Sequence, residues 1–233
     1  SHAGMVEGEM PTRAWRDIYF TSRDGLRLYG RHYPATAMTG QRPLLCLPGL
    51  ARNSMDFHEL ASDLSGRGSR SRDVWTIDYR GRGRSAHDPD PNNYSVYIEM
   101  LDVIDFMTVN GIVEPAILGS SRGGLILMML ACFRPTAIGV AVLNDIGPVI
   151  ERDGLVRIVA YVGRVPLPAT WPEAIDLVRG MSEKQFSGVP ERLWPAIARK
   201  FYFDDNGFPA PTYDRRLAEA VSMLDGPFPT LWR

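Results

Sequence analysis

Apolar and polar positions alternate in short runs near the start of the chain. Trp15 to Thr21 and Leu26 to Tyr33 follow the two-residue period of half-buried strands, and Arg23-Asp24-Gly25 between them predicts a hairpin turn. Pro43 to Leu47 is wholly apolar, which is typical of a strand buried on both faces of a parallel sheet, and Val74 to Ile77 is predicted as another short buried strand. The pattern therefore predicts a hairpin that leads into a buried sheet.

Helical patterns separate the later strands. Asn53 is a predicted N-cap for a helix from about Met55 to Leu64, and Ser95 for a helix that runs to about Asn110. A strand over 115–119, a helix over 122–134 and a strand over 138–144 follow. This alternation predicts an α/β fold, with a mostly parallel, doubly wound sheet and helices on both of its faces.

The pattern changes near Pro148. Residues 150–226 contain helical patterns broken by many prolines, are rich in aromatic residues and include no convincing strand. We expect a helical cap inserted over the sheet, with Trp171, Trp194 and Phe201 on the wall of an apolar substrate pocket. A helical layer with no role in substrate binding is the alternative.

This change sets the predicted domain organisation. Residues 1–10 are a tail that begins with a tag remnant, and residues 11–149 are the α/β core. Residues 150–226 are the helical cap, and residues 227–233 begin a return to the core. The chain is long enough for one full core with an inserted cap.

Composition excludes several classes of partner. The net charge of −1 and the scattered basic residues indicate binding neither to nucleic acid nor to an anionic membrane surface. Cys46 and Cys132 lie in apolar runs, so neither a disulfide nor a metal site is expected. No apolar run approaches the ~18 residues of a membrane span, and the N-terminus lacks a secretion signal. We therefore expect a cytoplasmic protein, whose oligomeric state the sequence leaves open.

The segment Gly119-Ser120-Ser121-Arg122-Gly123 carries the strongest chemical signal. It follows the apolar run Pro115 to Leu118 and leads into the apolar run Leu125 to Phe133. A serine at such a strand-to-helix turn is exposed, and the helix N-terminus beneath it favours developing negative charge. The pattern therefore predicts a nucleophilic serine at position 121, and the alternative is a buried structural serine.

Four motifs together resemble the α/β-hydrolase family with a helical cap. They are Leu47-Pro48-Gly49-Leu50, Asp78 to Ser85, Gly119 to Gly124, and Asn144-Asp145-Ile146-Gly147-Pro148, in the family's order and at its usual spacing. The resemblance covers nearly the whole chain after the first residues. It implies a hydrolase without cofactor or metal, in which Ser121 attacks a substrate carbonyl and forms an acyl-enzyme.

The resemblance also implies how the reaction's oxyanion is held. The backbone N–H groups of Leu50 and Arg122 are expected to form the oxyanion hole, and Pro48 stands where the family usually has histidine. We expect the Arg122 side chain to be exposed and to make no specific contact, and an ion pair with a carboxylate of the cap or of a loop near the mouth of the site is the alternative. The Arg-rich run from Arg80 to Arg84 is a structural loop in the family, and it lacks the spacing of a phosphate-binding motif.

The sequence leaves the other two members of the catalytic triad open. The family's order is serine, acid, histidine, yet all four histidines precede Ser121: His2, His32, His58 and His87. Three explanations compete: the histidine lies beyond Arg233 with the family's last strands, His87 is the base, or hydrolysis has been lost. The acid is either Asp145, with a structural turn residue as the alternative for that position, or a carboxylate beyond Arg233.

The expected activity follows from these residues and the resemblance. We expect a serine hydrolase that cleaves a small carboxylic ester or lactone of apolar character. Cleavage of carbon–carbon bonds in β-diketone-like compounds by the same site is the nearest alternative. A non-catalytic homologue that binds a small molecule is the alternative from another class.

Overall fold

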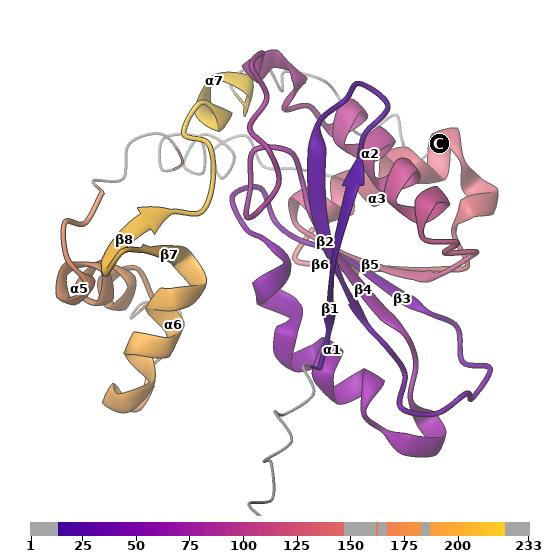
Figure 1. Ribbon diagram of the computed structural model, residues 1–233, viewed down its shortest axis with the longest axis horizontal. Coiled ribbons are helices and arrows are strands. Elements are labelled where there is room, and N and C mark those ends of the chain that lie inside the picture. The colour runs from indigo at the N-terminus through magenta and orange to yellow at the C-terminus, as the bar shows by residue number, and fades with distance from the viewer. Residues whose placement is uncertain (1–13, 147–161, 163–166, 183–186, 222–233) are drawn as a thin grey trace, which may run out of the picture.

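The computed structural model describes residues 14–146, 162, 167–182 and 187–221. A six-stranded sheet runs through the core in the order β1-β2-β4-β3-β5-β6 (Figure 1). Its strands are β1 Arg16–Thr21, β2 Arg27–Tyr33, β3 Leu44–Leu47, β4 Val74–Asp78, β5 Ala116–Ser120 and β6 Val140–Asn144. β2 pairs antiparallel with β1 and β4, and all other neighbours pair in parallel. The predicted α/β class is confirmed.

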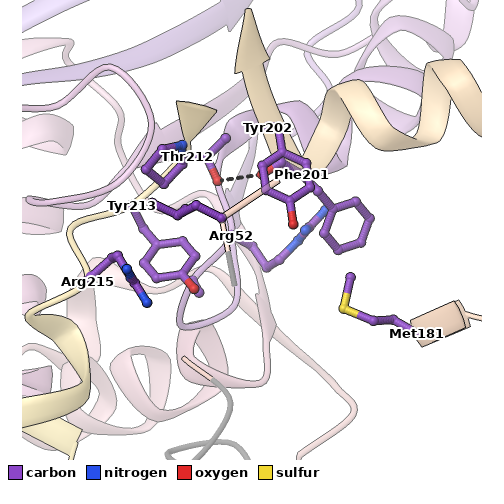
Figure 2. A pocket seen from close by; sticks show the side chains of 10 residues that line it. Arg52, Met181, Phe201, Tyr202, Thr212, Tyr213 and Arg215 are labelled. Atoms are coloured by element: carbon purple, nitrogen blue, oxygen red, sulfur yellow. Dashed lines mark hydrogen bonds between the residues drawn. The ribbon is translucent and has the colours of Figure 1, made fainter. Parts of the chain in front are cut away.

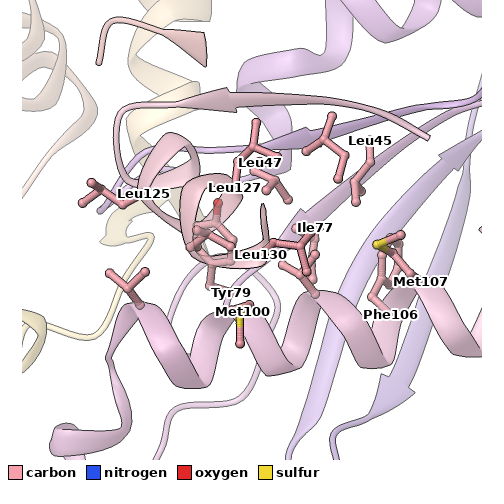
Figure 3. Close-up of a cluster of buried hydrophobic side chains, with 14 of the residues drawn as sticks. Leu45, Leu47, Ile77, Tyr79, Met100, Phe106, Met107, Leu125, Leu127 and Leu130 are labelled. Carbon is pink, nitrogen blue, oxygen red and sulfur yellow. The ribbon is translucent and has the colours of Figure 1, made fainter. Parts of the chain in front are cut away.

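Helices cover both faces of this sheet. On one face, α1 (His58–Ser65) packs over a small cluster that includes Leu44 and Cys46. On the other face, α2 (Val96–Val109) and α3 (Arg122–Phe133) enclose the main core, which includes Leu45 and Leu47 (Figure 3). Successive residues of β3 therefore face opposite layers, which is why this strand is apolar throughout.

Local sequence signals set the ends of the helices. The Ser95 hydroxyl accepts a hydrogen bond from the Ile98 N–H, which confirms Ser95 as the N-cap of α2. The Asn53 side chain accepts one from the Met55 N–H, but a short 3-10 turn over Ser54–Phe57 comes first and α1 begins only at His58. The predicted hairpin turn between β1 and β2 is confirmed, and Gly25 supplies its positive φ of 94°.

The second half of the chain contains α5 (Trp171–Ser182), α6 (Trp194–Phe201) and α7 (Leu217–Val221). It also contains an antiparallel hairpin of β7 (Tyr202–Asp205) and β8 (Phe208–Pro211), so the expectation of no strand here is wrong. Asn206 and Gly207 form the two-residue loop with φ of 51° and 88°. An Asn-Gly pair with both φ positive is the strongest short-range hairpin signal. The hairpin forms here although prolines, which disfavour strands, surround it.

The end of this second half is bound to the core. The Asp214 N–H donates to the Gly81 carbonyl over 2.6 Å, and the Gly83 N–H donates to the Thr212 carbonyl over 2.7 Å. The loop after β4 is thus fastened to the segment that follows β8. The predicted boundaries near residue 150 and at 227–233, and the tail 1–10, lie outside the described residues. Within the described helices, none is long and apolar enough to cross a membrane.

Candidate active site

Ser121 occupies the turn between β5 and α3 in a rare backbone conformation. Its φ of 50° and ψ of −109° lie in a region that residues with a side chain seldom adopt. The Ser121 N–H donates to the Asn144 carbonyl over 3.1 Å, which ties the turn to the end of the neighbouring strand. The hydroxyl makes no capping bond to α3, although Ser121 is at the N-cap position. The strained turn therefore leaves this hydroxyl available for chemistry.

The glycines around Ser121 are required by close packing. A Cβ on Gly119 would lie 2.6 Å from the Gly123 carbonyl oxygen, and a Cβ on Gly123 would lie 2.1 Å from the Leu47 carbonyl oxygen. Neither distance is possible for a real side chain. The glycines thus let the first turn of α3 rest directly on the end of β3, where the loop with Leu50 begins.

The structure brings the two expected oxyanion segments to one edge of the sheet. β3 and β5 are hydrogen-bonded parallel neighbours, with Leu47 paired to Gly119. The loop with Leu50 leaves β3 and the turn with Ser121 leaves β5, so both start from the carboxyl ends of adjacent strands. Within the described residues, no acceptor binds the backbone N–H of Leu50 or of Arg122. Among the residues that the structure describes, both N–H groups thus meet the requirement for an oxyanion hole, which is to have no acceptor of their own.

Side chains from the loop after β4 hold the Leu50 loop in place. The Tyr79 hydroxyl donates to the Pro48 carbonyl over 2.8 Å, and Arg82 Nε donates to the Leu50 carbonyl over 2.7 Å. Tyr79 and Arg82 are both fully buried. These two bonds hold the loop that begins at Pro48, so the proline at this position does not leave the loop without support.

The Arg122 side chain is buried, and the expectation of an exposed arginine without contacts is wrong. Its Nε donates to Glu99 Oε1 over 2.9 Å and its Nη2 to Glu99 Oε2 over 3.1 Å. A further bond from Nη2 reaches the Tyr94 carbonyl over 3.3 Å. α2 packs against α3 and presents Glu99 to it, which the position of Arg122 at the start of a helix did not reveal.

Asp145 follows β6 and lies close in sequence to the acceptor of the Ser121 N–H. It has a φ of 55° and an exposed side chain. Its carboxylate makes no hydrogen bond or ion pair with any residue in the described part of the chain. Asp145 therefore lies at the same edge of the sheet as the Ser121 turn, and its carboxylate makes no bond to the described residues.

The three described histidines have other partners. His32 bonds to Asp73 over 2.8 Å, and the His58 ring bonds to the Tyr33 hydroxyl over 2.9 Å. His87 is exposed and lies near Asp214, with its Nδ1 3.7 Å from the carboxylate. None of the three is hydrogen-bonded to Ser121, and His2 lies outside the described residues.

A cavity with aromatic walls opens between the Leu50 loop and the second half of the chain (Figure 2). Phe201 lines it, and the Arg52 guanidinium lies 3.8 Å from the centroid of the Phe201 ring. Trp194 is instead buried in a cluster between α5 and α6, and the Trp171 indole donates to Asp204 over 2.8 Å. Of the three expected pocket residues, only Phe201 lines this cavity. Its other walls are Ala51, Leu167, Met181, Tyr202, Pro211, Thr212, Tyr213 and Arg215.

Comparison with known proteins fits this geometry. A profile of the alpha/beta hydrolase fold family matches residues 42–188, which include β3, the Ser121 turn and α5. The chain belongs to the α/β-hydrolase family. Within the described residues of this hydrolase, no group of histidine, cysteine and carboxylate side chains is arranged to hold a metal ion.

Several α/β-hydrolases and ester-cleaving proteins are similar to this chain. A crystal structure of an alpha/beta hydrolase from Novosphingobium aromaticivorans superposes with a TM-score of 0.80 and 36% identity, over 88% of this chain and 70% of that one. A 3-hydroxybutyrate-oligomer hydrolase from Cupriavidus necator is 32% identical over 65% of this chain and 50% of its own length. An sn-1-specific diacylglycerol lipase from Mus musculus is 29% identical over 63% and 46% respectively. The chain spans about half the length of these curated relatives.

Sequence reasoning missed several residues of this hydrolase that hold the oxyanion segments or line the cavity. Tyr79 and Arg82 lie in a motif that had been interpreted as a structural loop, and Glu99 lies in a helix with no chemical signal. A carboxylate among the apolar positions of α2 was the only available hint, because buried charges require partners. Tyr213 lines the cavity from a segment in which no pattern stands out.

Proposed function

We propose that this α/β-hydrolase cleaves a carboxylic ester or lactone through an acyl-enzyme on Ser121. The observation that carries the proposal is the backbone of Ser121, held at φ 50° with a hydroxyl that does not cap its helix. A strained serine of this kind persists only where the surrounding structure enforces it, and such strain concentrates at functional sites. The names of the relatives, an oligomer hydrolase and a lipase, support ester cleavage as the reaction class.

The chemistry proceeds in two steps. Ser121 Oγ attacks the carbonyl carbon and passes its proton to the base, and the resulting oxyanion accepts bonds from the Leu50 and Arg122 N–H groups. The carbon–oxygen bond to the alcohol then breaks, and the alcohol leaves with the proton. Water, deprotonated by the same base, hydrolyses the acyl-enzyme and restores the serine. Each oxyanion donor contributes about 3 kcal/mol to lowering the barrier.

The proposal requires a base, and none of the three described histidines is hydrogen-bonded to Ser121. It assigns the triad acid to Asp145, whose carboxylate has no partner within the described residues. The substrate is a small ester with an apolar part, which suits a cavity lined by Phe201, Tyr202 and Tyr213.

Labelling with a fluorophosphonate tests the proposal, since this probe phosphonylates activated serines. The full-length protein is incubated with the probe and the modified residue is located by mass spectrometry. We expect labelling at Ser121, complete loss in Ser121→Ala, and retention in Ser120→Ala. Ser120 is a matched control because it is the adjacent residue and its hydroxyl accepts a bond from the Asn144 amide over 3.3 Å.

Two outcomes would contradict the proposal. Absence of labelling in the full-length protein would favour a non-catalytic homologue that binds a small molecule. Labelling at Ser121 together with turnover of β-diketones, but not of esters such as p-nitrophenyl butyrate, would assign carbon–carbon bond hydrolysis to the same site.

A further inference from the structure

Three ionised side chains form a buried cluster beneath the candidate oxyanion hole: Arg82, Glu99 and Arg122. Arg82 and Glu99 are fully buried and Arg122 is 3% exposed. Glu99 accepts two bonds from Arg122, at 2.9 and 3.1 Å, and a bond from Arg82 at 3.0 Å. One carboxylate thus holds two guanidinium groups from different segments of the chain.

Each arginine of this cluster is attached to a different oxyanion segment. Arg82 donates its Nε to the Leu50 carbonyl, and therefore holds the loop that offers the Leu50 N–H. Arg122 belongs to the second segment, because its own backbone N–H, at the start of α3, is the other expected donor. Glu99 is bonded to both arginines, so it links the two donors through two side chains.

We propose that Glu99 is a positioning residue, which fixes the spacing of the Leu50 and Arg122 N–H groups by holding Arg82 and Arg122 at once. The inference rests on the proposed function, because an oxyanion hole has meaning only for carbonyl chemistry. Glu99 does not touch the substrate. It acts through the two arginines, and its effect is on how well the donors fit the transition state.

The charge of the cluster supports this role. Burial raises the pKa of Glu99, but the positive charges of Arg122 and Arg82 outweigh it and the pKa falls below its usual range, so the carboxylate is ionised. The nearest buried phenol, Tyr79, has its pKa raised well above the usual range by burial, and is neutral. Two cations and one anion leave an excess of one positive charge beside the donors, where a negative charge develops in the reaction.

Stability alone does not account for such a cluster. Apolar residues of similar volume often replace buried ion pairs without loss of stability, because removing charges from water is costly. A buried carboxylate shared by two arginines does, however, define their relative positions through directional bonds. Position is what an oxyanion hole requires, since a displacement of about 1 Å can cost ~100-fold in rate.

A neighbouring pair on the same helix provides a matched control. Asp102 lies three residues after Glu99 on α2, is 1% exposed and binds Arg80 through bonds of 2.6 and 2.7 Å. Arg80 also binds Asp24 and Asp88, so Asp102→Asn leaves it with two carboxylate partners. This pair is as deeply buried as the cluster and lies on the same helix, but it makes no bond to Leu50 or Arg122.

The test compares three variants of the full-length protein: Glu99→Gln, Arg122→Met and Asp102→Asn. Arg122→Met keeps the backbone N–H and leaves Glu99 paired with Arg82, so it provides an answer if Glu99→Gln does not fold. For each we would measure kcat and KM with p-nitrophenyl butyrate, the rate of fluorophosphonate labelling and Tm. For Glu99→Gln and Arg122→Met we expect kcat and labelling to fall ~10- to 100-fold, with KM changed less than about 2-fold.

Asp102→Asn is expected to lower Tm by less than Glu99→Gln does, because Arg80 keeps two carboxylate partners, and kcat should stay within about 2-fold of the wild type. Equal losses of kcat in all three variants, or no loss in Glu99→Gln and Arg122→Met, would overturn the positioning role. A wild-type protein that neither labels nor hydrolyses esters would instead overturn the proposed function, and the inference with it. Measurements on the wild type therefore distinguish a failure of the positioning role from a failure of the proposed function.

Discussion

Gly123 rests on the carbonyl of Leu47 so closely that a Cβ at this position would come within 2.1 Å of the oxygen. The contact joins the first turn of α3 to the end of β3. It therefore fixes the distance between the Ser121 turn and the loop that carries Leu50. The proposed mechanism requires these two segments to keep a constant spacing.

Gly123→Ala is expected to push α3 away from β3, because the clash is with backbone and cannot be relieved by a side-chain rotation. We expect the free energy of unfolding to fall by about 1–3 kcal/mol and the labelling of Ser121 to slow by at least ~10-fold. Denaturant unfolding and fluorophosphonate kinetics measure the two effects.

Gly180 in α5 is the control for this variant, since a Cβ there would meet no atom within 4 Å. Gly180→Ala should leave labelling unchanged and raise the free energy of unfolding by about 0.4–1 kcal/mol. Equal labelling rates in Gly123→Ala and Gly180→Ala would show that the contact with Leu47 does not set the geometry of the turn.

The strain at Ser121 predicts that its removal costs no stability. Ser121→Gly abolishes labelling, but glycine adopts the positive φ without penalty, so the free energy of unfolding should stay level or rise by up to about 1 kcal/mol. Ser120 lies in the regular strand β5 next to Ser121, and Ser120→Gly should lower the free energy of unfolding by about 0.5–1 kcal/mol. Thermal and denaturant unfolding of the two variants measure this difference. A large loss of stability in Ser121→Gly would show that the backbone of Ser121 is not strained.

Asp145→Asn tests the proposed triad acid with little risk to folding. Asparagine tolerates the positive φ of this position at least as well as aspartate does, so Tm should change by less than about 2 °C. If Asp145 orients and stabilises the base, kcat should fall by ~10⁴-fold. A variant with nearly unchanged kcat on p-nitrophenyl butyrate would place the acid elsewhere.

Acid should weaken the attachment of the second half of the chain to the core at Asp214. Burial raises the pKa of Asp214, but bonds from Arg216 and Tyr94 outweigh it and lower the pKa to about 2. His87 also faces this carboxylate. Because the folded pKa lies below the unfolded value of about 3.9, the stabilisation is complete above about pH 4 and is lost as pH falls towards 2.

Asp214→Asn should therefore lower Tm at pH 7 by about 2–4 °C and reduce the further loss of Tm between pH 4 and pH 2. Thermal unfolding followed across this pH range measures both quantities. If Tm falls equally with pH in the wild type and in the variant, Asp214 does not contribute to the loss of stability between pH 4 and pH 2.

Local patterns in the sequence were sufficient for most of the core. Ser95 was predicted as the cap of α2 and Gly25 as part of the first turn, because capping and turn formation depend on a few neighbouring residues. The hairpin at Asn206-Gly207 also has a local signal, although no strand was expected in this proline-rich stretch.

The side-chain partners of the site could not be predicted in the same way. Arg122 was expected to be exposed, and Glu99 was not considered, although the two are bonded in the structure. They lie 23 positions apart, on helices that meet only when both pack on the sheet. Nothing in the neighbourhood of either residue specifies the other.

By itself, therefore, the sequence determined most strands and helices of the core and the glycine-flanked turn at Ser121, because periodicity, caps and steric freedom act over a few residues. Only the tertiary structure decided which charges are buried, what braces the Leu50 loop and which aromatic residues line the cavity. Those features depend on contacts between distant segments, and a buried charge is tolerated only where the fold brings it a partner.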